Sequence, residues 1–230
     1  MHTLKPVTLR RSIWLAALRL VLVGKACAAP TDQPPLDPLI LRGALSARAR
    51  PVAQSDTGVV VVFNSSGMGS GFVVSKDGAV LTNAHVVGRS RRLKVRWSDG
   101  SESQARLLRI NRKLDAALIQ VADDHHRPLP LRTRLPNVGD TVFAIGTPLD
   151  LDLQGTLSRG IVSAIRKVEG GTLIQSDVSI THGNSGGPLL DEKGNVVGMA
   201  VSGLDNTSAN LNFFIPVTEI LAGLNLKPGS

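Results

Sequence analysis

The sequence has few aromatic residues, no tyrosine and a single cysteine. Aromatic residues make up only 3% of the 230 residues, which argues against a surface that stacks single-stranded nucleic acid on aromatic rings. One cysteine excludes a disulfide framework and a cysteine-rich zinc site. Hydrophobic residues account for 42% and charged residues for 19%, so wholesale disorder is excluded. We expect a chain that folds around an apolar core without disulfide bonds.

The formal net charge of +8 is concentrated at the N-terminus. The sequence has 26 Lys and Arg against 18 Asp and Glu, and five of the basic residues but no acidic ones lie in the first 28 positions. Without that segment the net charge is +3. The basic character therefore gives little support to a nucleic-acid partner, and we expect none.

Residues 1–28 have the layout of a secretory signal. Basic residues precede an apolar run from Ile13 to Val23, and the small residues Ala26-Cys27-Ala28 follow. This order predicts cleavage after Ala28 and export to a periplasm or out of the cell. Because Arg19 interrupts the run, an uncleaved N-terminal anchor and an amphipathic cytosolic N-terminus stay open as alternatives. The run is too short for a comfortable membrane span, and we expect no integral span in the mature chain.

A proline-rich lead-in covers residues 29–56, where Leu36–Ala49 are expected to form a short helix. Residues 57–230 form the folded domain, in which short β-branched runs alternate with turn signals. The expected strands are residues 59–63, 71–74, 79–82, 93–97, 105–110, 116–121, 141–145, 160–165, 172–175, 196–201 and 211–215. This pattern predicts an all-β sandwich or barrel, and a final helix is expected after Pro216.

Three segments contain the side chains needed for nucleophilic acyl transfer. His85 follows an expected strand, Asp115 precedes an apolar one, and Ser185 lies within Gly183-Asn184-Ser185-Gly186-Gly187-Pro188-Leu189. A serine hydroxyl needs a neighbouring base near neutral pH, and a carboxylate can fix the tautomer of a histidine base. Glycines beside the serine let backbone N–H groups approach a developing oxyanion. Asp99 is a weaker candidate for the carboxylate, because Asp99-Gly100 is typical of a turn.

These stretches resemble the trypsin-like peptidase domain of the HtrA/DegP serine proteases. The resemblance covers roughly residues 57–225 and rests on Gly69-Ser70-Gly71-Phe72, Thr82–Val87, Asp115–Ile119, Ser158–Ser163, Ile174–Asp177, Gly183–Leu189 and Asn212–Pro216. It implies two six-stranded antiparallel β-barrels, at about residues 57–127 and 137–225, with the active site between them and a short C-terminal helix. It also implies a serine endopeptidase that acts on polypeptides, with no metal and no cofactor.

The resemblance assigns roles to residues of this sequence. His85 is the base, Asp115 orients it and Ser185 is the nucleophile, while the oxyanion hole is expected at Gly183, Asn184 and Ser185. The substrate pocket is expected at Thr181, His182, Val201, Ser202 and Gly203. We expect small aliphatic residues at P1, the substrate position before the cleaved bond, since Asp177 corresponds to a structural aspartate of the family. The family also implies a homo-oligomer, often a trimer.

Two features depart from the family pattern. HtrA proteases usually have one or two peptide-binding PDZ domains after the protease, and none is expected here after the final helix. The usual Asn-Pro before the Gly-Asn-Ser segment is replaced by Thr181-His182, which leaves a narrow preference for acidic P1 residues open. An inactive or conditionally active protease fold that serves as a binding module is the other alternative.

Overall fold

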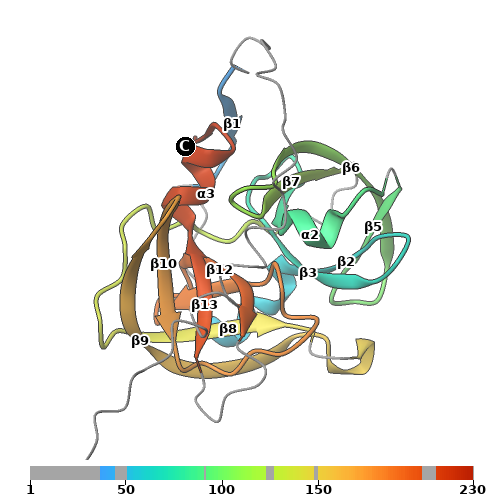
Figure 1. Ribbon diagram of the computed structural model, residues 1–230. Coiled ribbons are helices and arrows are strands. Elements are labelled where there is room, and N and C mark those ends of the chain that lie inside the picture. Colours follow the sequence, from blue (N-terminus) through green and yellow to red (C-terminus); the bar gives the residue numbers. More distant parts are fainter. Residues whose placement is uncertain are drawn as a thin grey trace, which may run out of the picture. The chain divides into compact units, whose positions relative to one another are not determined.

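The computed structural model describes residues 37–44, 51–90, 92–122, 127–147, 150–203 and 211–229, and the backbone alone of Ser202 and Gly203. The predicted signal at residues 1–28 lies outside these residues. Within them, twelve strands form two closed six-stranded barrels, in which every neighbouring pair of strands is antiparallel (Figure 1). The predicted all-β class with two six-stranded barrels is therefore confirmed.

The first barrel has the strand order β2-β3-β4-β7-β6-β5. Its strands are β2 (Val59–Phe63), β3 (Met68–Val73), β4 (Ala79–Thr82), β5 (Leu93–Arg96), β6 (Glu102–Asn111) and β7 (Ala116–Val121). A single turn of helix, α2 (Ala84–Val87), follows β4 directly. The 3-10 turns η1 (Val52–Gln54) and η2 (Asp56–Gly58) precede this barrel.

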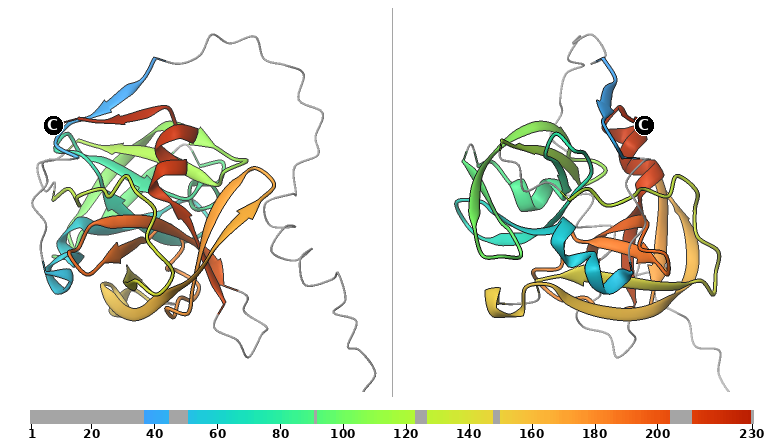
Figure 2. Two further views of the ribbon diagram at one scale, coloured as in Figure 1. Left: turned by 90° about the vertical axis from the view of Figure 1, so that its left-hand side faces the viewer. Right: turned by 180° about the vertical axis from the view of Figure 1, so that it is seen from behind.

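The second barrel has the strand order β10-β13-β12-β11-β8-β9. Its strands are β8 (Thr141–Gly146), β9 (Thr156–Val168), β10 (Gly171–Ser176), β11 (Pro188–Asp191), β12 (Val196–Gly203) and β13 (Asn212–Pro216), with the 3-10 turn η3 (Leu151–Leu153) before β9. Helix α3 (Val217–Gly223) follows β13 (Figure 2), and its Pro216 N-cap and buried Ile220 and Leu221 agree with the expected final helix.

The short helix predicted within Leu36–Ala49 is not formed at its described residues. Leu39–Leu41 instead form strand β1, which pairs in parallel with β14 (Leu226–Pro228) after α3. The pairing is extended by main-chain bonds, from Leu39 N to Asn225 O at 3.1 Å and from Gly229 N to Leu41 O at 2.9 Å. This long-range partner satisfies backbone groups that a local helix would otherwise pair.

The core joins both barrels. One apolar cluster contains Phe72 and Leu118 of the first barrel, Met199 and Ile215 of the second, and Ile220 of α3. Two further clusters fill the individual barrels, one around Val60 and Ile119 and one around Ile174 and Phe214. Burial of these side chains fixes the barrels against each other through a shared apolar contact, which positions residues from both barrels at one site.

Candidate active site

His85 and Asp115 come together because of the register between β4 and β7. Thr82 at the end of β4 pairs with Ala117 near the start of β7. The chain just after β4 therefore lies at the same end of the sheet as the chain just before β7. His85 is on α2, three residues beyond Thr82, and Asp115 directly precedes β7. Antiparallel pairing thus brings together two residues that are 30 positions apart in the sequence.

Both oxygens of the Asp115 carboxylate contact His85. The His85 backbone N–H donates to Oδ1 at 2.9 Å, and the ring Nδ1 lies 2.7 Å from Oδ2. The Asp115 side chain is 18% exposed and that of His85 is 45% exposed. A carboxylate at Nδ1 favours the tautomer that carries its proton there, which leaves Nε2 as the basic atom.

Asn83 fixes the backbone of Asp115. The φ angle of Asp115 is 58°, in the left-handed region that residues other than glycine rarely adopt. The fully buried Asn83 donates from Nδ2 to the Asp115 carbonyl at 2.9 Å. This bond holds the unusual backbone in place, and the sequence analysis did not identify Asn83 as part of the site.

Ser185 lies between β10 and β11, in a segment that we call the Ser185 loop (residues 181–187). Its Oγ donates to the carbonyl oxygen of Val201 at 3.1 Å. The register between β12 and β13 shifts at Val201, which lies between the paired residues Ala200 and Ser202; bulges of this kind often occur beside active sites. Within the described part of the chain, no hydrogen bond joins Ser185 Oγ to His85.

Gly69 marks how closely the Ser185 loop approaches α2. A Cβ at Gly69 would lie 2.6 Å from the Val86 side chain and 3.1 Å from the Ser185 carbonyl oxygen. Val86 follows His85 on α2, so one glycine of β3 separates the helix of the predicted base from the loop of the predicted nucleophile. The structure therefore brings His85, Asp115 and Ser185 into one region where the barrels meet.

The backbone N–H groups of Gly183 and Ser185 are available as donors. The N–H groups of Asn184, Gly186 and Gly187 donate to Thr181 O, Ala200 O and Asn184 O. Across the residues that the structure describes, those of Gly183 and Ser185 donate no hydrogen bond. Of the three residues predicted to form the oxyanion hole, Gly183 and Ser185 thus keep a free donor, whereas the N–H of Asn184 is occupied. The Asn184 side chain is buried, and a Cβ at Gly146 would lie 2.5 Å from its Oδ1.

The residues predicted to line the substrate pocket lie on two segments. Thr181 and His182 are exposed in the Ser185 loop. Val201, Ser202 and Gly203 are the last residues of β12, where Ser202 pairs with Phe213 and Gly203 with Asn212. Asp177 is exposed, and one oxygen of its carboxylate, Oδ1, accepts the Ile161 N–H at 2.7 Å. This contact fits the predicted structural role of Asp177.

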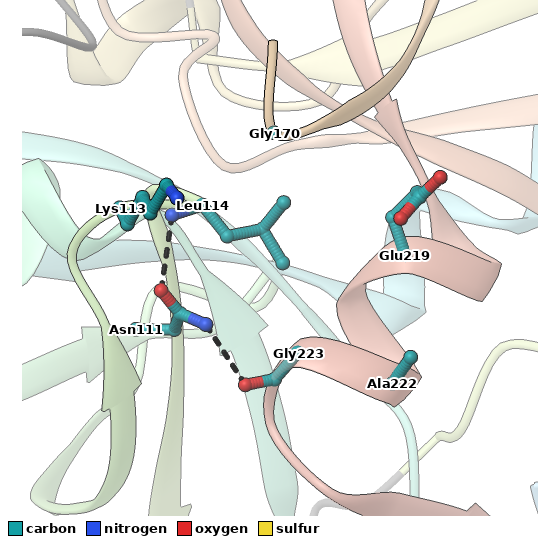
Figure 3. A pocket seen from close by; sticks show the side chains of 7 residues that line it. All are labelled: Asn111, Lys113, Leu114, Gly170, Glu219, Ala222 and Gly223. Carbon is teal, nitrogen blue, oxygen red and sulfur yellow. Dashed lines mark hydrogen bonds between the residues drawn. The ribbon is translucent and has the colours of Figure 1, made fainter.

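A separate hollow of about 300 Å³ is lined by none of the predicted site residues (Figure 3). It lies between the turn after β6, the turn after β9, and α3, with Lys113 and Glu219 among its lining residues. Asn111 Nδ2 donates to Gly223 O at 2.9 Å, and Asn111 Oδ1 accepts the Leu114 N–H at 3.0 Å. These bonds attach the segment before Asp115 to α3.

The described residues contain no group of three or more His, Cys, Asp or Glu side chains placed to hold a metal ion. His125 and His126 lie outside the described residues. No helix in the described part of the chain is both long and apolar enough to span a membrane.

The trypsin-like peptidase domain family matches residues 69–199, more than half of the chain. The chain belongs to this family. The peptidase is 41% identical to the serine protease HTRA1 of Xenopus laevis over 164 residues, which are 66% of this chain and 34% of that protein. It is 40% identical to the probable periplasmic serine endoprotease DegP-like of Pseudomonas putida over 161 residues, 65% of this chain and 32% of that protein.

A solved structure supports the same relationship. The serine endoprotease from Yersinia pestis superposes on the peptidase with a TM-score of 0.67 at 31% sequence identity, covering 76% of this chain and 65% of that one. The predicted resemblance to HtrA and DegP proteases is thus confirmed. The chain spans about a third of the length of the curated relatives that it matches.

Proposed function

We propose that the chain is a serine endopeptidase that hydrolyses peptide bonds through an acyl-enzyme. The observation that carries the proposal is the His85–Asp115 pair, together with the Ser185 loop next to α2. Among the described residues, the N–H groups of Gly183 and Ser185 in that loop donate no hydrogen bond. Acyl transfer by serine needs a base, a group that orients the base, and donors for the oxyanion. His85, Asp115, and the N–H groups of Gly183 and Ser185 supply these parts, and membership of the trypsin-like peptidase family supports the assignment.

The reaction begins when the Ser185 hydroxyl exchanges Val201 O for His85 Nε2 as its acceptor. Ser185 Oγ attacks the peptide carbonyl carbon, and His85 takes the hydroxyl proton. The two N–H groups stabilise the oxyanion, and Asp115 stabilises the imidazolium through Nδ1. His85 then protonates the leaving amine as the C–N bond breaks. Water, activated by the same imidazole, hydrolyses the acyl-enzyme and restores Ser185.

The Val201 carbonyl gains a second role in this sequence of steps. Once Ser185 Oγ has turned away, Val201 O, on a bulged strand next to the nucleophile, has lost this hydrogen bond. It can accept an N–H group from a substrate segment that lies alongside β12, in the manner of an added strand. This arrangement selects extended polypeptide, which favours unfolded regions over compact ones.

We propose unfolded or damaged exported protein as the substrate class, with small aliphatic residues at P1. The assignment is supported by the DegP-like relative, whose name describes a periplasmic endoprotease, and by the bound carboxylate of Asp177. A narrow preference for acidic P1 residues is the alternative that the exposed His182 favours. Cleavage of unfolded casein, mapped by mass spectrometry, distinguishes the two preferences. Cuts after Val and Ala support our proposal, and cuts confined to Glu and Asp support the alternative.

The same assay tests the binding-module alternative. We expect the full chain to degrade casein and the Ser185→Ala variant to bind casein without cleaving it. If both proteins bind casein and neither cleaves it, the chain acts as a binding module rather than as a protease.

Export and self-association are two further parts of the proposal. We propose cleavage of the signal after Ala28 and a periplasmic or secreted location, for which N-terminal sequencing of the exported protein is the direct test. An oligomer of identical chains, such as a trimer, is our proposal for the assembly. Several apolar side chains of the second-barrel segment are exposed, namely Val138, Leu153, Leu157 and Ile161, and a second copy would cover them. Light scattering on the purified protein measures the assembly.

A further inference from the structure

Ser70 is a buried polar residue that links β3 of the first barrel to the Ser185 loop of the second. Its exposed fraction is 0%. Its Oγ donates to the carbonyl oxygen of Gly183 at 2.7 Å and accepts the N–H of Thr147, which follows β8, at 3.2 Å. The hydroxyl proton is therefore directed at the Gly183 carbonyl in the loop, while the hydroxyl oxygen accepts a bond from the buried Thr147 on a different segment.

The main chain of Ser70 contacts the same loop. Its N–H donates to the Ser185 carbonyl at 2.8 Å, and its own carbonyl accepts the hydroxyl of Thr82 at 2.7 Å. Ser70 thus binds two carbonyl groups, those of Gly183 and Ser185. These are the two residues predicted to supply N–H groups to the oxyanion hole, and neither N–H donates a hydrogen bond within the described part of the chain.

Gly183 needs such a restraint because of its backbone. Its φ angle is 94°, in a region where glycine has wide freedom to rotate. A rotation at this residue would change the direction of the Gly183 N–H relative to that of Ser185. The Ser70 hydroxyl opposes the rotation by holding the carbonyl on the C-terminal side of the pivot.

We propose that Ser70 is a positioning residue that holds the Ser185 loop in the geometry required for oxyanion stabilisation. The proposal rests on the proposed function, because it assigns Ser70 to the oxyanion step of that reaction. Ser70 does not touch the substrate. It acts through Gly183, and the contact couples the first barrel to the reactivity of a loop in the second.

Ser70→Ala removes the hydroxyl and leaves the main-chain bond to Ser185. Ser75→Ala is the matched control, because Ser75 is also a buried serine of the first-barrel segment, and its hydroxyl accepts the N–H of Ala79 in its own turn. Loss of one oxyanion donor lowers kcat by about 100- to 1,000-fold in a serine protease. Since Ser70→Ala loosens the donors without deleting them, we expect kcat to fall about 10- to 100-fold. We expect KM to change by less than about threefold, because ground-state binding is retained.

The kinetic test compares a peptide boronic acid ending in valine with a peptide of the same sequence ending in a carboxylate. The boronic acid forms a tetrahedral adduct with serine, so its affinity should fall by the same factor as kcat/KM in Ser70→Ala. The affinity of the carboxylate peptide should not change. Ser70→Cys retains a weak donor and should give intermediate values. Equal losses for both peptides, or equal kcat values for Ser70→Ala and Ser75→Ala, would overturn the proposal.

Hydrogen exchange tests the loop independently of activity. We expect the hydrogen-bonded amides of Asn184, Gly186 and Gly187 to exchange about tenfold faster in Ser70→Ala than in the wild type, because local opening becomes easier. In Ser75→Ala they should exchange at the wild-type rate. Unchanged exchange in Ser70→Ala would overturn the positioning role. If the wild type shows this protection but cleaves no peptide, the proposed function fails while the positioning of the loop stands.

Discussion

Gly186 lies directly against the main chain of Ser70. A Cβ at Gly186 would come within 2.2 Å of the Ser70 carbonyl oxygen and 2.6 Å of Thr82 Oγ1. The contact joins the residue after the nucleophile to β3, and only glycine fits. The glycine that follows Ser185 is therefore required for the two barrels to meet at the site.

Gly186→Ala should destabilise the protein strongly. Its φ of 87° adds backbone strain to the steric overlap with a carbonyl that cannot move away, and together these should cost more than about 3 kcal/mol. Two controls separate the causes. Gly139→Ala meets no atom within 4 Å but has a φ of 91°, so it should lose about 1 kcal/mol. Gly67→Ala has neither problem and should stay within about 0.5 kcal/mol of the wild type. Urea unfolding of the three variants gives the order of their free energies of unfolding. A Gly186→Ala protein as stable as Gly67→Ala would contradict this packing.

Asp115→Asn should lower kcat by about 10⁴-fold, because an amide cannot hold His85 in the tautomer that keeps Nε2 basic. Asp99→Asn is the matched control. Asp99 Oδ1 accepts bonds from the N–H and hydroxyl of Ser101 in its own turn, so this variant should keep kcat within about twofold of the wild type. Steady-state cleavage of a peptide substrate by both variants makes the comparison. A larger loss in Asp99→Asn than in Asp115→Asn would exchange the roles of the two carboxylates.

Asp177→Ala should change stability and leave specificity unchanged. It removes the carboxylate that accepts the Ile161 N–H in an exposed hydrogen bond. Because water can replace this acceptor, the cost should be below about 1 kcal/mol. Glu169→Ala serves as the control, because Glu169 is an exposed carboxylate in the turn between β9 and β10. The melting temperature should be lower for Asp177→Ala and unchanged for Glu169→Ala. The casein cleavage sites of Asp177→Ala should match those of the wild type. A change in cleavage after Lys or Arg would show instead that Asp177 reads the P1 residue.

Local sequence patterns predicted the strands that have clear ends. Ala79–Thr82 and Ala116–Val121 were predicted with their observed bounds, because each is an apolar run between turn or polar residues. The predicted strand at residues 160–165 is part of the longer β9, Thr156–Val168. Its outer residues are mostly exposed and mostly polar or basic, namely Thr156, Ser158, Arg159, Arg166 and Lys167, so the apolar pattern does not extend over them. Strand β11 was missed because it begins at Pro188, directly after a glycine-rich segment.

Contacts between distant segments could not be predicted in this way. Strand β1 depends on a partner near the C-terminus, and a leucine-rich segment considered alone fits a helix equally well. Within the site, the motifs indicated His85, Asp115 and Ser185 by residue type. The bond from Ser70 to Gly183 spans 113 positions, and Val201 receives Ser185 Oγ through a bulge that no local pattern marks. Such contacts follow from how the two barrels pack.

The most direct test of the proposed activity is labelling with a fluorophosphonate, which reacts with an activated serine and forms an oxyanion-like adduct. The full chain should be labelled at Ser185, labelling should be absent in Ser185→Ala, and it should be strongly slowed in Asp115→Asn. A folded wild-type protein that stays unlabelled, or that is labelled equally with and without Ser185, would contradict the assignment of Ser185 as the nucleophile.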